Sequence, residues 1–183
     1  MIEKKLDEIA EVFSGVQISR FVENNSNLTP VIKNKFIKDD ILDYSLENVS
    51  EGINQKYFSK KGDIIISLSQ PNTVSLLNEE GFIIPMYFAI IRLKKGYDAS
   101  FMYHVFNSDI FHKQIHTLLE GGALKIIKLS DLKKIKINIP DFEKQKKYGE
   151  FLDLIDKKSI LLENKKECNK KIKEYFIKTQ VMR

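Results

Sequence analysis

The chain has 183 residues, of which 43% are hydrophobic and 30% are charged, and its formal net charge is +5. Its first residues are charged rather than apolar, and no stretch approaches the ~20 apolar residues of a membrane helix, so we expect neither a signal peptide nor a membrane span. The single cysteine, Cys168, excludes an internal disulfide and is consistent with a reducing cytoplasm.

The positive charge is concentrated near the C-terminus. Residues 1–140 carry 18 Lys and Arg against 17 Asp and Glu, whereas residues 141–183 carry 12 against 8. A basic chain is compatible with a nucleic-acid partner, although charge alone is a weak indication.

The first sixty residues predict short elements separated by turns. Residues 5–12 have the pattern of a short amphipathic helix, which Ser14 and Gly15 end. Residues 17–23 fit a strand that leads into a polar turn. Residues 31–37 fit a less regular strand, and residues 48–60 fit a loop.

The next eighty residues combine strands and helices. The β-branched run at 63–68 predicts a buried strand, and turn-forming residues 69–73 follow it. Further strands are predicted at 74–77, 82–93, 125–128 and 135–139. Helices are predicted from Asp98 or Ser100 to 107, over 109–119 after a Ser108 cap, and as one turn after a Ser130 cap. We therefore expect residues 1–140 to form one mixed α/β domain.

The last quarter of the chain predicts one long helix. Pro140 and Asp141 suit a helix start, and the pattern is helical from about residue 143 to 180. At ~1.5 Å per residue, this helix reaches roughly 57 Å. Residues 141–183 are therefore predicted to be a long coiled-coil helix that extends beyond the mixed α/β domain.

The apolar residues of this helix form a seam with alternating three- and four-residue spacing, interrupted by Lys158 and Lys165. An exposed helix is stabilised mainly by burying its apolar face, so this seam needs a cover, either from this chain or from a second chain. The predicted helix–helix interface consists of Phe151, Leu154, Ile155, Leu161, Leu162, Cys168, Ile172 and Tyr175.

The sequence contains no recognisable catalytic or cofactor-binding constellation. His112 and His116 have a spacing that can ligate zinc, but Lys113 stands where the metalloprotease pattern requires Glu. Gly-rich phosphate loops and Ser-His-Asp sets are not evident. From the residues alone we therefore single out no catalytic site and expect no metal or cofactor.

Polar and basic side chains instead gather in the predicted loops and on one strand. Asn and Gln amides can bond adenine, hydroxyl groups can bond bases or phosphates, and lysines can contact phosphates. Taken singly, each residue is better explained as part of a solvated loop or surface strand, and the set gains weight only from the resemblance described below. The candidate DNA-contacting residues are Gln17, Ser19, Arg20, Lys33, Lys35, Ser67, Ser69, Gln70, Asn72, Thr73, Lys125 and Lys128.

The order of segments resembles the specificity subunit of type I restriction–modification systems. The similar pieces include KKLDEIAEVFSG, KKGDIIIS and DASFMYHVFNSDIFHKQI, and then the stretch from ALKIIKLSDLKKIKINIP into DFEKQKKYGEFLDLID. This resemblance implies target-recognition domains, each followed by a long helix, with antiparallel helices that dock methyltransferase subunits. It also implies that the subunit is not catalytic.

This chain has one such domain and one helix, so it corresponds to half a subunit. We hypothesise that the seam pairs with the same helix of a second copy, so that a homodimer rebuilds the full-length layout and reads a symmetric, split DNA site. The resemblance implies that such an assembly directs methyltransferase and restriction subunits to that site. Two alternatives remain: the specificity portion of a fused restriction–methyltransferase, and a dimeric interaction module that does not bind DNA. The homodimer prediction fails if the helix folds back and buries its seam against its own domain.

Overall fold

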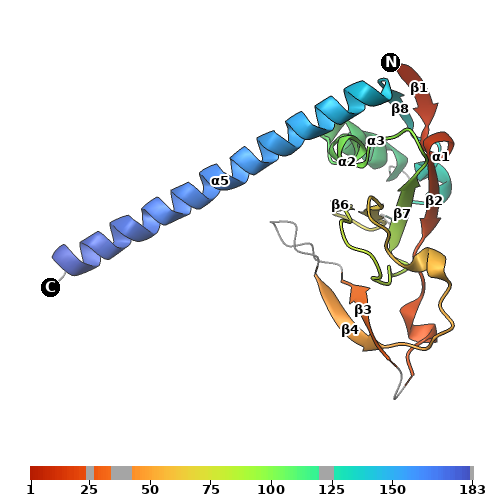
Figure 1. Cartoon of the computed structure of the whole chain (residues 1–183), viewed down its shortest axis with the longest axis horizontal. Coiled ribbons are helices and arrows are strands. Elements are labelled where there is room, and N and C mark those ends of the chain that lie inside the picture. Colours follow the sequence, from red (N-terminus) through yellow and green to blue (C-terminus); the bar gives the residue numbers. More distant parts are fainter. Residues whose placement is uncertain (24–26, 34–42, 120–125, 182–183) are drawn as a thin grey trace.

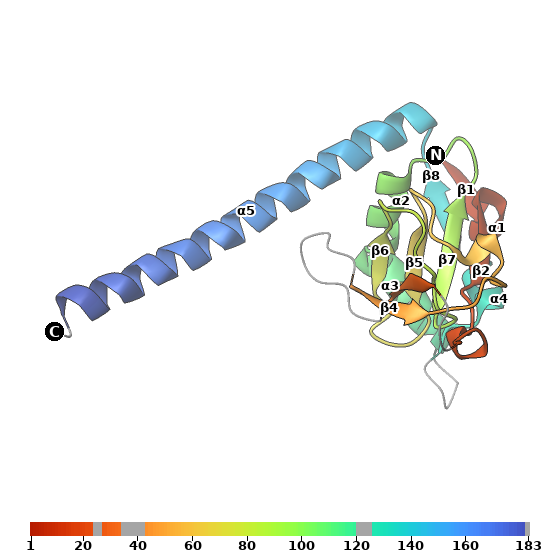
Figure 2. The same ribbon diagram turned by 60° about the horizontal axis from the view of Figure 1, so that its bottom comes forward.

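The computed structural model describes residues 1–23, 27–33, 43–119 and 126–181. They form a globular α/β domain from which one long helix projects, as predicted. Figure 1 and Figure 2 show that this helix, α5 (Phe142–Gln180), starts at one end of the globular domain and runs away from it. Within the described residues, no helix is both long enough and apolar enough to cross a membrane.

The globular domain is organised around a four-stranded antiparallel sheet with strand order β2-β7-β5-β6. Its central strand β5 is fully buried, and its side chains alternate between two hydrophobic clusters. Ile64 and Ile66 enter one cluster, whereas Ile65 enters the other. The strands are β2 (Ala10–Ser14), β5 (Ile64–Ser67), β6 (Val74–Leu76) and β7 (Phe88–Leu93).

The larger cluster lies under the helices and under a second, two-stranded sheet. In that sheet β1 pairs with β8, which brings the N-terminus of the chain beside the start of α5 (Figure 1). The elements around this cluster are β1 (Ile2–Lys5), α1 (Leu6–Ile9), α2 (Ala99–Phe106), α3 (Asp109–Leu119), α4 (Leu129–Leu132) and β8 (Lys136–Ile139).

The opposite end of the globular domain carries a two-stranded ribbon, β3 (Leu28–Ile32) paired with β4 (Tyr44–Asn48). Figure 1 shows this ribbon at the end of the domain remote from the start of α5. The ribbon is fixed by a third cluster that includes Val31, Val49 and Ile83. Two 3₁₀ turns, η1 (Ile18–Arg20) and η2 (Gln55–Tyr57), lie in the connections at this end.

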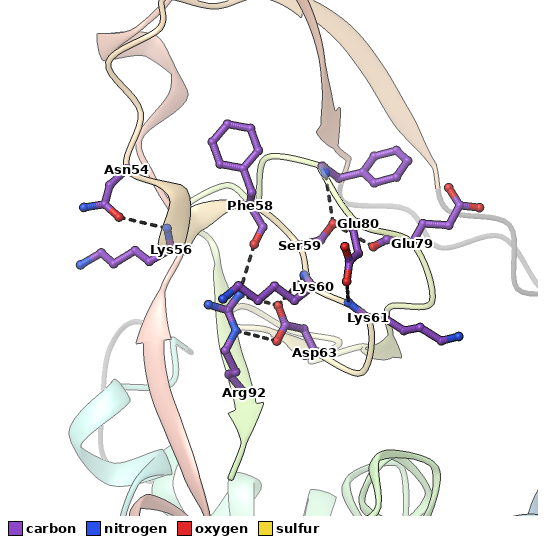
Figure 3. Close-up of polar contacts among 11 residues, drawn as sticks. Asn54, Lys56, Phe58, Ser59, Lys60, Lys61, Asp63, Glu79, Glu80 and Arg92 are labelled. Atoms are coloured by element: carbon purple, nitrogen blue, oxygen red, sulfur yellow. Dashed lines mark hydrogen bonds and ion pairs between the residues drawn. The ribbon is translucent and has the colours of Figure 1, made fainter. Parts of the chain in front are cut away.

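A buried ion pair holds the connection before β5 against the sheet. Arg92 of β7 donates to both carboxylate oxygens of Asp63, at 2.9 and 2.7 Å, and also to the carbonyl oxygen of Phe58 (Figure 3). The hydrogen bond to Asp63 raises the pKa of Arg92 above its ordinary value. Because Asp63 is 2% exposed, this bidentate pair is shielded from water and fixes the start of β5.

Several element predictions were wrong for physical reasons. In place of the strand predicted over 125–128, the described residues 126–128 make only an isolated bridge between Ile126 and Ser69. The helix predicted over 5–12 stops at Ile9, because Ala10–Ser14 pairs with β7 instead. The strand predicted over 17–23 is the 3₁₀ turn η1 with irregular flanks. The strand predicted over 82–93 begins only at Phe88, since 83–85 make isolated bridges to other segments.

Three of the four predicted helix caps are confirmed. Asp98 caps α2 by accepting from the backbone N–H of Phe101, and Asp141 caps α5 by accepting from that of Lys144. Ser108 accepts from Phe111 at the start of α3. The Ser130 cap was wrong, since α4 begins after Lys128 without a side-chain cap.

Candidate nucleic-acid interface

The loop after β5, residues 67–73, is held by its own polar groups. Asn72 donates its side-chain amide to the carbonyl oxygen of Ser67 at 3.0 Å, and the Ser67 hydroxyl donates to the carbonyl oxygen of Ser69 at 2.9 Å. Asn72 has φ 56°, a left-handed conformation that Asn tolerates better than most residues. Both Ser67 and Asn72 are nearly inaccessible to solvent, so their side chains shape the loop from within.

The remaining candidates of this loop differ in accessibility. Gln70 is exposed, whereas Ser69 and Thr73 are half-buried. The exposed amide of Gln70 is therefore the group of this loop best placed to reach an external partner.

The segment around Lys128 adjoins this loop. The backbone N–H of Ile127 donates to the carbonyl oxygen of Leu68 at 2.8 Å, and Ile126 forms a bridge with Ser69. The structure thus brings together two regions that were predicted separately. Lys128 is exposed beside them. Lys125 lies outside the described residues.

The first candidate loop is joined to the same surface through residues 84–88. Val16 donates to Ile84 and accepts from Met86, while the backbone N–H of Leu68 donates to the carbonyl oxygen of Tyr87. Residues 84–88 therefore lie between the 67–73 loop and the 15–20 loop. In the latter, the predicted residues Gln17, Ser19 and Arg20 are all exposed.

Tyr87 is a member of this surface that the sequence did not single out. Its hydroxyl donates to the carbonyl oxygen of Ile32 at 3.2 Å, next to exposed Lys33, and partial burial raises the pKa of its phenol. Its place within an apolar strand-like run gave no signal that it links the end of β3 to the 67–73 loop. Lys35 lies outside the described residues.

The described residues contain no group of three or more His, Cys, Asp or Glu side chains arranged to hold a metal ion. His112 is half-buried and His116 is exposed on α3. What the loops offer chemically is therefore amide, hydroxyl and basic groups, which suit hydrogen bonding to bases and phosphates.

The first third of α5 docks on the start of α2 through polar side chains. Gln145, 2% exposed, accepts from the backbone N–H of Asp98 at 3.0 Å and donates to the carbonyl oxygen of Pro140 at 2.9 Å. One turn further on is Gly149, where a Cβ would stand 2.9 Å from the backbone nitrogen of Phe101. Only a glycine allows α5 to approach α2 this closely.

Asp153 completes the docking one turn after Gly149. Its carboxylate accepts from the Ser100 hydroxyl at 2.7 Å and lies 2.8 Å from Nε2 of His104. Asp156 is more distant, 3.7 Å from Nδ1 of the same ring. At the very start of α5, the hydrogen bond from Lys144 holds the pKa of Asp141 below its ordinary value.

The predicted seam of α5 is uncovered in the structure. Every residue of α5 from 157 to 178 is exposed. The large apolar side chains of the seam are among the most solvent-accessible hydrophobic side chains of the described residues. Phe151 is 62%, Leu154 63%, Ile155 44%, Leu161 68%, Leu162 56%, Ile172 60% and Tyr175 71% exposed, and Cys168 is also exposed. The helix does not fold back to bury the seam against its own domain.

The docking face and the seam lie on opposite sides of α5. At about 100° per residue, the direction between Gly149 and Asp153 lies about 150° from the direction between Phe151 and Leu154. A second helix can therefore lie along the seam without displacing α2.

Comparisons with known proteins agree with this architecture. The family described as the type I restriction modification DNA specificity domain matches residues 1–174. A curated relative, the type I restriction enzyme MjaVIII specificity subunit of Methanocaldococcus jannaschii, is 26% identical over 183 residues, covering 93% of this chain and 43% of the relative. The chain thus spans less than half the length of that relative.

Solved structures share the fold. A structure from work on complex assembly and conformational transition of the type I R-M system has a TM-score of 0.70 and 18% identity, covering 95% of this chain and 43% of its own. The HsdS subunit of Thermoanaerobacter tengcongensis gives 0.64 and 19%, covering 89% and 39%. The S subunit of M. genitalium gives 0.61 and 16%, covering 96% and 44%.

The shared features are a globular domain and the long helix that follows it, and the family match extends over both. The chain therefore belongs to the type I restriction modification DNA specificity domain family.

Proposed function

We propose that this chain is a non-catalytic DNA sequence-recognition subunit that reads one half-site per copy. In this proposal it directs methyltransferase and restriction subunits to that site. The observation that carries the proposal is the family match across residues 1–174 of a chain that spans less than half of its curated relative.

Exposed polar residues on four adjoining segments would contact the DNA. Gln70 and Gln17 have amides suited to reading a base edge, while Lys33, Arg20 and Lys128 would contact phosphates and set the register. All five side chains are exposed. The buried Ser67 and Asn72 would act through the shape of their loop rather than by contact.

Two copies joined through α5 would place two globular domains along one DNA molecule. Such a homodimer has two-fold symmetry and would therefore read a symmetric, split site. The uncovered seam, on the side of α5 opposite to its own domain, supports this arrangement.

Methylome sequencing of cells that express this chain with its cognate methyltransferase tests the proposal. We expect methylation at a split palindromic motif. Gln70→Ala should relax the motif at one position in each half, whereas Lys128→Ala should weaken binding uniformly and reduce the salt dependence by about one phosphate contact. A methylome that is unchanged by the presence of the chain, together with salt-insensitive DNA binding, would refute the proposal.

The spacing between half-sites offers a second test. Inserting seven residues after Asn164 preserves the seam pattern and lengthens α5 by roughly 10 Å, about three base pairs at ~3.4 Å each. We expect the unspecified gap in the methylated motif to lengthen accordingly. An unchanged gap would contradict a role for α5 in setting the separation of the two domains.

A further inference from the structure

A turn at residues 85–88 places two large side chains at its corner. The backbone N–H of Phe88 donates to the carbonyl oxygen of Pro85 at 3.1 Å, which makes Met86 and Tyr87 the two central residues of the turn. Small or polar residues and proline dominate such positions, because they suit the backbone geometry or bond to it. Met86 is instead large, apolar and 51% exposed. Since a single exposed Met is ordinary on a protein surface, its meaning depends on its surroundings.

Three other segments of the chain hold this turn in place. The backbone N–H of Met86 donates to the carbonyl oxygen of Val16 at 2.9 Å, and that of Leu68 donates to the carbonyl oxygen of Tyr87 at 2.9 Å. The Tyr87 hydroxyl donates to the carbonyl oxygen of Ile32 at 3.2 Å. The backbone that carries Met86 is therefore fixed before any partner arrives, which lowers the entropic cost of a specific contact.

The surroundings of Met86 are polar and basic. Gln17, Lys33 and Gln70 each lie one or two residues from a segment that holds the turn, and all three are exposed. Amide groups of this kind suit base edges, and lysines suit phosphates. An apolar side chain among such groups fits the groove of a DNA duplex better than an apolar protein surface, because the flanking groups would lose water there without partners.

We propose that Met86 is a specificity-determining residue that contacts the 5-methyl group of a thymine in the major groove. This inference rests on the proposed function of DNA recognition. Among the four standard bases, thymine alone presents a methyl group in that groove, and it is read by apolar contact rather than by a hydrogen bond. The flexible, polarisable thioether of Met adapts well to such a contact. Tyr87 is a positioning residue, since its hydroxyl ties the turn to the end of β3.

Replacing thymine by deoxyuridine tests this contact, because deoxyuridine lacks the 5-methyl group and keeps every hydrogen-bonding group. The full chain, in complex with its methyltransferase, is titrated with duplexes that carry the methylated motif. Each thymine of a half-site is replaced in turn, symmetrically in both half-sites. We expect one position at which the replacement weakens binding roughly fourfold per half-site, as expected for one buried methyl group.

Substitutions of Met86 assign that effect to its side chain. Met86→Ala should bind the thymine duplex at least as weakly as the parent binds the sensitive uridine duplex, and it should lose the preference for thymine at that position. Met86→Leu keeps a large apolar side chain and should retain the preference. The salt dependence of binding should be the same in both variants, since neither removes a phosphate contact.

Ile110→Ala is the matched control. Ile110 is 72% exposed on α3, so its substitution also shortens an exposed apolar side chain, but outside the segments that hold the turn. This variant should retain the full preference for thymine.

Two results would overturn the inference. One is a parent complex whose affinity is insensitive to uridine at every position. The other is a Met86→Ala protein that binds the thymine and uridine duplexes more weakly by the same factor, as expected of an apolar wedge in the minor groove. The uridine series on the parent needs no substitution in the protein, so it decides the question even if a variant fails to fold.

A scrambled duplex separates these results from failure of the proposed function. A parent complex that prefers the motif over the scrambled duplex but ignores uridine refutes the role of Met86 alone. A parent complex without that preference refutes DNA recognition by this chain, and the role of Met86 with it.

Discussion

The two parts of α5 are one continuous helix with different means of stabilisation. The docked part, residues 142–156, is held on α2 by Gln145, by the close approach at Gly149 and by the carboxylate of Asp153. The free part, residues 157–181, is exposed along nearly its whole length and is held by contacts within its own helix, such as the ion pair between Glu167 and Lys171. The globular domain thus specifies where α5 begins and in which direction it runs, but not what covers its far end.

The free part therefore depends on an external cover for its stability. Exposed ion pairs within a helix contribute only about 0.2–0.5 kcal/mol each, and isolated helices of limited length are marginal in water. Burying one exposed Leu or Ile contributes roughly 1.5–3 kcal/mol. The seam residues are thus the largest source of stability available to the free part.

The largest predicted effect comes from placing charge on the free seam. Replacing both Leu161 and Ile172 by Glu removes two apolar side chains per copy and opposes them with carboxylates. A loss of about 3 kcal/mol or more weakens dimerisation at least about 100-fold. Sedimentation equilibrium measures this change, and circular dichroism should show lower helix content with an intact globular domain.

Lys166→Glu is the control for this variant, since it changes a charge on the polar side of α5. It should leave the dimer within a few-fold of its original affinity. Equal weakening by the control would mean that general charge, rather than the seam, governs association.

The next effect concerns the docked part. Gly149→Ala gains about 1 kcal/mol of helix propensity, but the added Cβ forces α5 away from Phe101 at a cost of about 1–3 kcal/mol. We expect a net loss of docking stability and faster amide hydrogen exchange in residues 142–156. The measurement is made in the Leu161→Glu, Ile172→Glu background, so that dimerisation does not mask it.

Asn164→Ala in the free part provides the comparison for this glycine substitution. It should leave exchange in residues 142–156 unchanged. A Gly149→Ala protein with slower exchange than the parent would contradict the close contact between α5 and α2.

A smaller loss is expected from Asp153→Ala. The substitution removes the hydrogen bonds that the partly exposed carboxylate accepts from Ser100 and from the His104 ring. We expect this to lower the free energy that holds α5 on α2 by about 1 kcal/mol. Asp156→Ala should have less effect, because that carboxylate is 3.7 Å from the ring and more exposed. Thermal melts of the two variants in the same background give the comparison, and equal losses would assign no special role to Asp153.

The smallest effect is the pH dependence of the helix start. The hydrogen bond from Lys144 lowers the folded-state pKa of Asp141 below its ordinary value of 3.8. A carboxyl with a lowered folded pKa stabilises the fold above its unfolded pKa and loses this contribution as the pH falls through the folded value. The stability difference between the parent and Asp141→Asn should therefore be constant above about pH 5 and vanish in stronger acid. A difference that persists in strong acid would show that the charge is not its source.

The fold could be predicted from sequence where local patterns decide the structure. Local sequence alone specifies the helix caps at Asp98, Ser108 and Asp141 and the β-branched strand β5. Those elements therefore begin where the sequence predicts them. The strand prediction failed at residues 82–87, because the apolar residues there form isolated bridges to three distant segments instead of one continuous strand. Such long-range pairing leaves no periodic trace in the sequence.

The candidate site was predictable only as a set of loops. Composition after β5 pointed to residues 67–73, but only the structure separates exposed Gln70 from buried Ser67 and Asn72. The contact between Ile127 and Leu68, and the place of Tyr87 between segments, depend on tertiary packing. The apolar stripe of α5 follows from helical periodicity alone, whereas its role as a helix–helix interface stays a prediction.

Sedimentation velocity of the intact, reduced chain across low to high micromolar concentration is the most direct measurement of the central claim. An apolar seam that lies exposed on the side of α5 away from its own domain predicts a reversible, elongated dimer that dissociates on dilution. A chain that remains a monomer at tens of micromolar would contradict it.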